Sequence, residues 1–196
     1  LNNYLEQEVV MSTGANIYYR YGKGSPKERV DLIYVNYPQF KSIIEGCRSK
    51  LIYEIEAEKE YSHRKDIGEL GIRVQTTGHY SDRTSSQAIA NVMLEEELGQ
   101  EELSDDTLKG LEDTEEFIHK HRVLRMMQRE YRCFDGQLHM LPIESQRIIL
   151  PYLKHEKDYV QIADELGITV ESVRKRVYRI RKELVTELTD NFIESL

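Results

Sequence analysis

The chain has 196 residues, of which 32% are charged and 39% hydrophobic, with a formal net charge of −8. This length suits one domain with extensions or two small domains, and no run approaches the ~20 apolar residues that a membrane span needs. Because no secretory signal is evident and Cys47 and Cys133 belong to no metal or disulfide motif, we expect a cytoplasmic protein without metal, cofactor or membrane partner.

The first region, residues 1–36, is rich in tyrosine, glycine and asparagine. We expect it to be loosely ordered, with at most a short helix that begins at Pro26. A break is expected at Pro38, because the residue before a proline avoids the helical conformation. Apolar spacings of three and four then predict a helix over residues 38–61, and the glycines that follow predict a loop over residues 62–80.

Two further helices are expected in the middle of the chain. One covers residues 84–99, and we interpret residues 81–84 before it as its cap. A long charged helix is predicted over residues 104–134, ended by Asp135-Gly136. Its apolar stripe is expected to pack within the protein or against a second copy, so homo-oligomerisation is a predicted property.

The negative charge is concentrated in one segment. Residues 95–116 hold eleven acidic residues and one lysine, a balance of 1 − 11 = −10, so the rest of the chain sums to +2. Three interpretations of this acidic segment stay open: a solvated surface, a contact for a basic polymerase surface, and a region that orients the protein by repelling DNA. Residues 170–184 hold six Lys/Arg and two Glu, or 6 − 2 = +4, which is the basic footprint expected of a DNA-binding helix.

The last third of the sequence predicts a compact set of short helices. The first is opened by Pro142, and Pro151 within it is expected to kink or end it. A second helix is predicted from Asp158, with Gln161 as its capping partner. It ends at Gly167, where a left-handed backbone is usual.

A third helix follows a cap at Thr169. The small Ala163 allows two helices to cross closely, and one apolar seam leaves the other faces of the third helix free, as in a DNA-binding helix-turn-helix. An ordinary helical hairpin with a solvated charged face is the alternative, but it does not require these features in register. The seam consists of Val173, Val177, Ile180 and Leu184.

The exposed faces of this third helix carry the candidate DNA contacts. Glu171 can accept a hydrogen bond from cytosine and Arg174 can pair with guanine, each contact contributing about 1–3 kcal/mol of base discrimination. Lys175 can reach a base or a phosphate, whereas the later cations are expected to hold phosphates. The candidate set is Thr169, Glu171, Ser172, Arg174, Lys175, Arg176, Tyr178, Arg179 and Lys182.

Residues 141–184 contain four short motifs: Gln146-Arg147, Gln161-Ile162-Ala163, Leu166-Gly167-Ile168-Thr169 and Val173-Arg174-Lys175-Arg176-Val177-Tyr178-Arg179. Together they resemble region 4 of the sigma-70 family. Pro151 is a departure from the usual sequence pattern of that region. The resemblance implies a module that reads the −35 promoter element and touches RNA polymerase, with Glu171, Arg174 and Lys175 at base-contacting positions.

Upstream of this module, Asn36-Tyr37-Pro38-Gln39-Phe40 opens a helix and Ser81-Asp82-Arg83-Thr84 precedes another. With the long charged helix and the sigma-like end, residues 35–185 are similar to RinA/ArpU-type regulators of Gram-positive phages and prophages. This resemblance implies a phage-encoded activator of late genes, acting at the nucleoid of a bacterial host.

We therefore expect an all-α protein with three parts: a Tyr/Gly-rich segment over 1–36, a helical region over 37–136 and a helix-turn-helix domain over 137–196. The expected function is sequence-specific transcription regulation near promoters, with double-stranded DNA and host RNA polymerase as partners. Two alternatives stay open: a recognition protein for DNA packaging, like a phage terminase small subunit, and a divergent sigma factor. Oligomeric state separates packaging, which uses a ring of subunits, from transcription.

An enzyme is not expected. The sequence contains no Walker loop, no Gly-rich dinucleotide fingerprint and no nucleophile elbow. The six histidines form no HExxH motif, and the paired carboxylates lie in the acidic segment without an evident partner.

Overall fold

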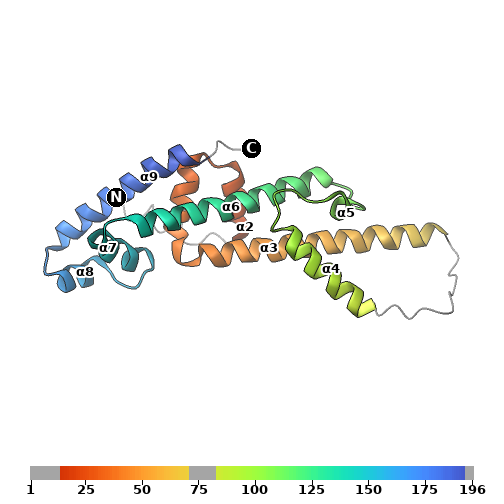
Figure 1. Cartoon of the computed structure of the whole chain (residues 1–196), viewed down its shortest axis with the longest axis horizontal. Helices are drawn as coiled ribbons and strands as arrows, with labels where there is room; N and C mark the ends of the chain where they lie inside the picture. The colour runs from red at the N-terminus through yellow and green to blue at the C-terminus, as the bar shows by residue number, and fades with distance from the viewer. Residues whose placement is uncertain (1–13, 71–82, 193–196) are drawn as a thin grey trace. The chain divides into compact units, whose positions relative to one another are not determined.

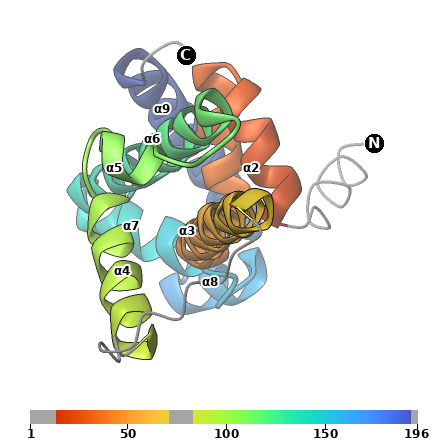
Figure 2. The same cartoon turned by 90° about the vertical axis from the view of Figure 1, so that its right-hand side faces the viewer.

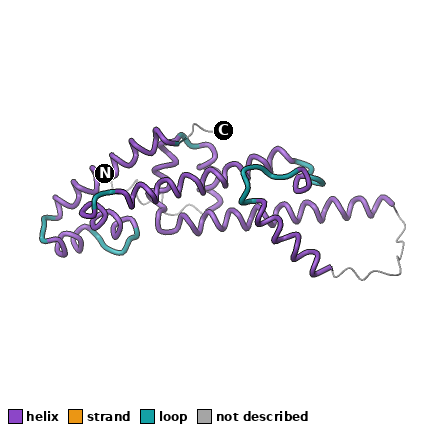
Figure 3. Tube along the Cα trace, viewed as in Figure 1, coloured by secondary structure: helices purple, strands orange, loops and turns teal. Residues whose placement is uncertain are grey.

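The computed structural model of the chain describes residues 14–70 and 83–192 (Figure 1). Within these residues every regular element is a helix, eight in all (Figure 3). This confirms the predicted all-α fold class. None of the helices in the described part of the chain combines the length and apolar character needed to cross a membrane.

The described residues form two compact units, which are each considered separately. Unit 1 contains residues 14–45 and 126–192, and unit 2 contains residues 46–70 and 83–125. Unit 1 is therefore built from the two ends of the described chain, because apolar side chains far apart in sequence bury one another. The predicted consecutive segments 1–36, 37–136 and 137–196 do not coincide with these units.

Unit 1 includes helix α2, the first part of α3, the end of α6, and helices α7 to α9. Residues 14–36, expected to be loosely ordered, are helical except for a two-residue turn, because Tyr21 and Ile33 are fully buried in the core. The bounds are α2 Gly14–Lys23, α3 Pro26–Leu70, α6 Thr114–Met140, α7 Ile143–Leu153, α8 Tyr159–Leu166 and α9 Val170–Asn191.

Helix α3 begins at Pro26, as predicted, but it is 45 residues long and not short. Its start is capped reciprocally: the Ser25 backbone N–H donates to Glu28 Oε2 (2.7 Å), and the Glu28 N–H donates to Ser25 Oγ (3.4 Å). Such a cap satisfies backbone donors that have no partner inside the helix.

The break expected at Pro38 is absent, because α3 continues through this residue. A proline inside a helix removes one hydrogen bond and costs about 3 kcal/mol or more. Aromatic packing on both sides of Pro38 offsets this cost. The ring centroids of Tyr37 and Phe134 lie 5.8 Å apart, and those of Phe40 and Tyr131 lie 5.6 Å apart.

Unit 2 contains the rest of α3, α4 (Arg83–Glu97), α5 (Asp105–Leu108) and the first part of α6. Helix α4 confirms the second predicted helix, although the cap expected over residues 81–84 lies outside the described side chains. Helix α3 extends to Leu70, so the predicted loop is wrong for residues 62–70, and residues 71–80 lie outside the described part.

The long charged helix predicted over residues 104–134 is wrong at both ends. Gly110, with φ of 86°, lies in the turn between α5 and α6, and Asp113 Oδ1 accepts a hydrogen bond from the Glu116 N–H (3.2 Å) at the start of α6. Asp135-Gly136 does not end α6, because Phe134 and Leu138 on either side are fully buried and hold the helix in place.

Candidate nucleic-acid interface

Helix α8 begins with a capping box, as the sequence predicts. The Asp158 side chain accepts hydrogen bonds from the backbone N–H groups of Val160 (2.8 Å) and Gln161 (2.9 Å). In return, Gln161 Oε1 accepts from the Asp158 N–H at 2.9 Å. The start of α8 is therefore set by local hydrogen bonds.

The turn between α8 and α9 depends on Gly167. Its φ of 64° and ψ of 32° are left-handed, a conformation that residues with a Cβ adopt at a cost. The Ile168 N–H donates to the Ala163 carbonyl (3.1 Å), which closes the end of α8. Thr169 Oγ1 accepts from the Ser172 N–H (3.2 Å) and caps α9. Both predicted positions, the glycine turn and the threonine cap, are confirmed.

One buried seam joins α9 to the rest of unit 1. Ile162 and Ala163 of α8 are also buried, so the two helices meet through small and aliphatic side chains. Val160 of α8 is 52% exposed, because it lies in the first turn beside the cap. The buried residues of the seam are Val173, Val177, Ile180 and Leu184, as predicted, together with Leu188.

Helix α7 precedes this pair of helices. Pro142, predicted at the first helical position, is the N-cap, so α7 begins one residue later, and Pro151 lies within its last turn. The helix ends at Leu153, where the Lys154 N–H donates to the Leu150 carbonyl (2.9 Å). Pro151 is expected to kink or end this helix, and the helix ends two residues after it.

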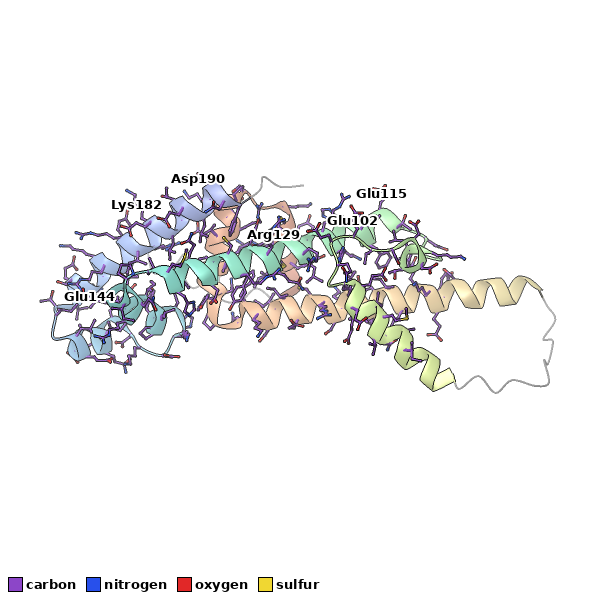
Figure 4. The ribbon with its side chains drawn as sticks, in the orientation of Figure 1. Glu102, Glu115, Arg129, Glu144, Lys182 and Asp190 are labelled. Atoms are coloured by element: carbon purple, nitrogen blue, oxygen red, sulfur yellow. The ribbon has the colours of Figure 1, made fainter. Side chains whose placement is uncertain are left out.

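The candidate DNA contacts lie on the faces of α9 opposite its seam. All are exposed except Ser172, which is half-buried beside Thr169. The Oγ atoms of Thr169 and Ser172 lie 2.8 Å apart, so both hydroxyls take part in the cap. Lys182 is on the outer side of α9 (Figure 4). The remaining exposed candidates are Glu171, Arg174, Lys175, Arg176, Tyr178 and Arg179.

Two candidate base contacts pair with each other. Lys175 Nζ lies 3.6 Å from Glu171 Oε1, one turn earlier on α9. Both side chains are well exposed, so this ion pair contributes at most about 0.5 kcal/mol. DNA can therefore exchange this internal pairing for external contacts at little cost.

The Arg174 guanidinium lies against an aromatic side chain that the sequence analysis does not single out. Its carbon is 5.7 Å from the ring centroid of Tyr159, at the start of α8. Tyr159 in turn stacks on Tyr152 of α7 at 4.7 Å, and their hydroxyls are 2.8 Å apart. No periodic pattern in the sequence indicates this arrangement, because it joins three different helices.

Arg181, which belongs to the basic stretch over residues 170–184, is half-buried. Its Nη2 donates to Asp31 Oδ1 of α3 at 2.9 Å, and its guanidinium lies 4.8 Å from the ring centroid of Tyr34. This cation therefore fastens α9 to α3 within unit 1. The described residues contain no group of three or more His, Cys, Asp or Glu side chains that could hold a metal ion.

Comparison with known families identifies this part of the chain. Residues 131–184 match the family model described as Sigma-70, region 4. The match begins near the end of α6 and includes α7, α8 and most of α9. No curated protein and no solved structure matches the chain. The C-terminal part is therefore a sigma-70 region 4 domain with a DNA-binding helix-turn-helix, and the match does not extend to the rest of the chain.

Proposed function

We propose that the protein is a transcriptional regulator that binds a defined duplex sequence through α9. One observation carries the proposal: in a region 4 domain, α9 is seated by one apolar seam and leaves five of its six cations exposed. A helix held in this way can enter the major groove without disturbing the core.

The roles of the side chains follow from their position along α9. Arg174, Glu171 and Lys175 are near the helix start, where a recognition helix reaches base edges. Arg176, Arg179 and Lys182 are assigned to phosphates, which set the register of the protein on DNA. Thr169 and Ser172 are at the cap, and Tyr178, which is 69% exposed, is assigned to the DNA backbone.

We further propose that the regulator is encoded by a phage or prophage, activates late genes in the bacterial cytoplasm, and acts near promoters with host RNA polymerase. The support is the resemblance of residues 35–185 to RinA/ArpU-type regulators and the region 4 domain, a module that serves promoter recognition.

The first test is selection of bound duplexes from a random library by the full chain. Salt is held at about 0.15 M, because phosphate contacts alone give tight but unspecific binding at low salt. The proposal expects one enriched motif, and the Arg174→Ala variant is expected to lose selectivity at one position of it. Absence of any enriched motif would contradict sequence-specific readout.

Transcription of templates that carry the enriched motif, with purified bacterial RNA polymerase, tests the finer proposal. More transcript in the presence of the protein supports an activator, and less transcript indicates a repressor. Molar mass in solution is the accompanying measurement. A closed ring of many subunits would favour a DNA-packaging recognition protein over a transcriptional regulator.

A further inference from the structure

Unit 2 contains an open groove between α3 and α4. It is lined by residues 53–60 of α3, residues 90–97 of α4 and a few residues near α5. Figures 1 and 2 show α4 diverging from α3 toward its N-terminal end. The groove has a volume of about 1390 Å³, above the ~300–1,000 Å³ typical of small-molecule pockets. Its size suits a segment of a macromolecule.

Large apolar side chains are exposed along this groove. Tyr53 and Met93, which line it, are 71% and 63% exposed, while Leu94 beside them is buried in the floor. Ile89 and Val92 of α4 are also more than half exposed, but they lie outside the groove lining. Tyr53 and Met93 therefore place exposed apolar surface inside one hollow, an arrangement typical of interaction sites.

The groove is also strongly acidic. Five carboxylates and one ammonium group, that of Lys59, line it, a balance of 1 − 5 = −4. The Lys59 Nζ donates to the Asp106 carbonyl (3.4 Å), so this cation is held at the groove wall, and burial lowers its pKa. The carboxylates belong to Glu56, Glu60, Glu96, Glu97 and Asp106.

The carboxylates differ in how far the fold satisfies them. Glu97 accepts hydrogen bonds from the Ser104 N–H (2.7 Å) and from the Thr107 hydroxyl, so it holds the chain before α5 in place. Glu56 differs, because its Oε1 is buried and accepts no hydrogen bond from the described residues. A buried acceptor without a donor is unfavourable, so Glu56 is the carboxylate of the groove that the fold satisfies least.

We propose that this groove binds a basic amphipathic helix of a partner protein. The apolar side chains would receive the apolar face of that helix, and the carboxylates would receive its lysines and arginines, as in other helix-in-groove complexes. The lining stretch of α3 is about two helical turns long, which suits an α-helix as the occupant.

The charge of the groove selects among occupants. A second copy of this chain that docked through the same groove would bring the same carboxylates against it, and like charges brought together oppose association. Nucleic acid would bring phosphates, which the carboxylates repel as well. The proposal does not depend on DNA binding by α9, because the residues that carry it belong to unit 2.

The test uses the full chain and a labelled synthetic helix of about 18 residues, or five turns. The probe has leucines at i, i+3, i+4 and i+7 and lysines elsewhere, and a matched peptide has glutamates in place of the lysines. Fluorescence anisotropy is expected to detect binding of the lysine peptide only, and added salt is expected to weaken it. Equal binding of both peptides would overturn the proposal.

Variants locate the binding. Met93→Ser and Glu56→Gln are expected to weaken binding of the lysine peptide about tenfold each, equivalent to about 1.4 kcal/mol. Val160→Ser and Glu144→Gln, at exposed positions of unit 1, are the matched controls and are expected to change nothing. Because Met93 is exposed, its replacement leaves the fold intact, which far-UV circular dichroism checks.

Two results would overturn the assignment. One is equal peptide affinity for the groove variants and their controls. The other is a dimer in sedimentation experiments that Met93→Ser converts to a monomer, since a second copy would then occupy the groove. Glu96→Lys, at an exposed rim position, gives an independent reading. It changes the charge balance of the groove from −4 to −4 + 2 = −2, so it is expected to weaken binding of the lysine peptide.

Discussion

Arg29 and Glu130 form a buried, two-pronged ion pair between α3 and α6. Nε of Arg29 lies 2.9 Å from Oε2 of Glu130, and Nη2 lies 2.9 Å from Oε1. Tyr21 donates its hydroxyl to the same carboxylate (2.6 Å), and Arg29 Nη1 donates to the Gly24 carbonyl (2.8 Å). Burial, with the Glu130 carboxylate next in importance, raises the pKa of Tyr21 well above its usual value, so its proton stays in the network.

Removing one member of this pair is expected to destabilise unit 1 strongly. Arg29→Met leaves a buried carboxylate without its counter-charge, which costs about 3–5 kcal/mol. Urea unfolding measures the change. The double variant Arg29→Met with Glu130→Met is expected to recover part of the loss, because no charge then remains buried. Arg132→Met, at an exposed position of α6, is the control, and an equal loss there would contradict the assignment.

Arg174 and Arg179 are expected to differ in what they contribute to DNA binding. Arg174→Ala should reduce selectivity at one base pair by about 1–3 kcal/mol, because a bidentate contact to guanine is lost. Arg179→Ala should weaken binding to all sequences alike. It should also reduce the slope of the logarithm of affinity against the logarithm of salt concentration by about one. Binding isotherms on cognate and altered duplexes at several salt concentrations distinguish them. Identical behaviour of the two variants would refute the division of roles.

Tyr159 is expected to position Arg174. Tyr159→Leu removes the aromatic face but keeps an apolar side chain, and should reduce selectivity at the Arg174 base pair about two- to fivefold, the size of an exposed cation–π contact. Tyr159→Phe keeps the ring and should retain selectivity. Competition between duplexes that differ at this base pair gives the measurement. A Phe variant as impaired as the Leu variant would show that the ring face is not the cause.

Gly167 is expected to be needed for its backbone conformation alone. A Cβ built there meets no atom within 4 Å, so the cost of Gly167→Ala comes from φ of 64° and should be about 1–2 kcal/mol. Gly136 is the matched control, since its Cβ also meets nothing but it lies inside α6. Gly136→Ala should stabilise by about 0.5–1 kcal/mol. Thermal unfolding should therefore shift in opposite directions for the two variants.

His121 is expected to make unit 2 sensitive to mild acid. Burial lowers its pKa below 6.5, although the Leu98 carbonyl 3.4 Å from Nε2 acts in the opposite direction. Arg125 nearby also lowers this pKa, and Glu97 raises it. The unfolded chain thus binds the proton more readily, so stability should fall as pH drops below about 6.5. His121→Leu should flatten the dependence between pH 7 and 5 in urea unfolding. An unchanged slope would mean that another group is responsible.

Sequence by itself determined the features that depend on neighbours in the chain. The cap at Asp158, the turn at Gly167 and the cap at Thr169 each involve residues within a few positions, so their patterns are visible in one sequence. The seam of α9 is equally local, because its spacing follows from the helical repeat. The candidate DNA contacts rest on this local reading and stay a prediction for the binding experiments above.

Only the tertiary structure decided what joins distant parts of the chain. Helix α3 continues through Pro38 because aromatic rings of α6 pack beside it. Arg181 is not part of the candidate DNA face because it pairs with Asp31, which lies 150 residues earlier in the chain. The contact between Arg174 and Tyr159 depends on how α8 and α9 cross. The periodicity of a sequence indicates which face of a helix is apolar, but it does not indicate which other helix covers that face. The pairing of helices is determined by the packing of side chains that are far apart in the sequence.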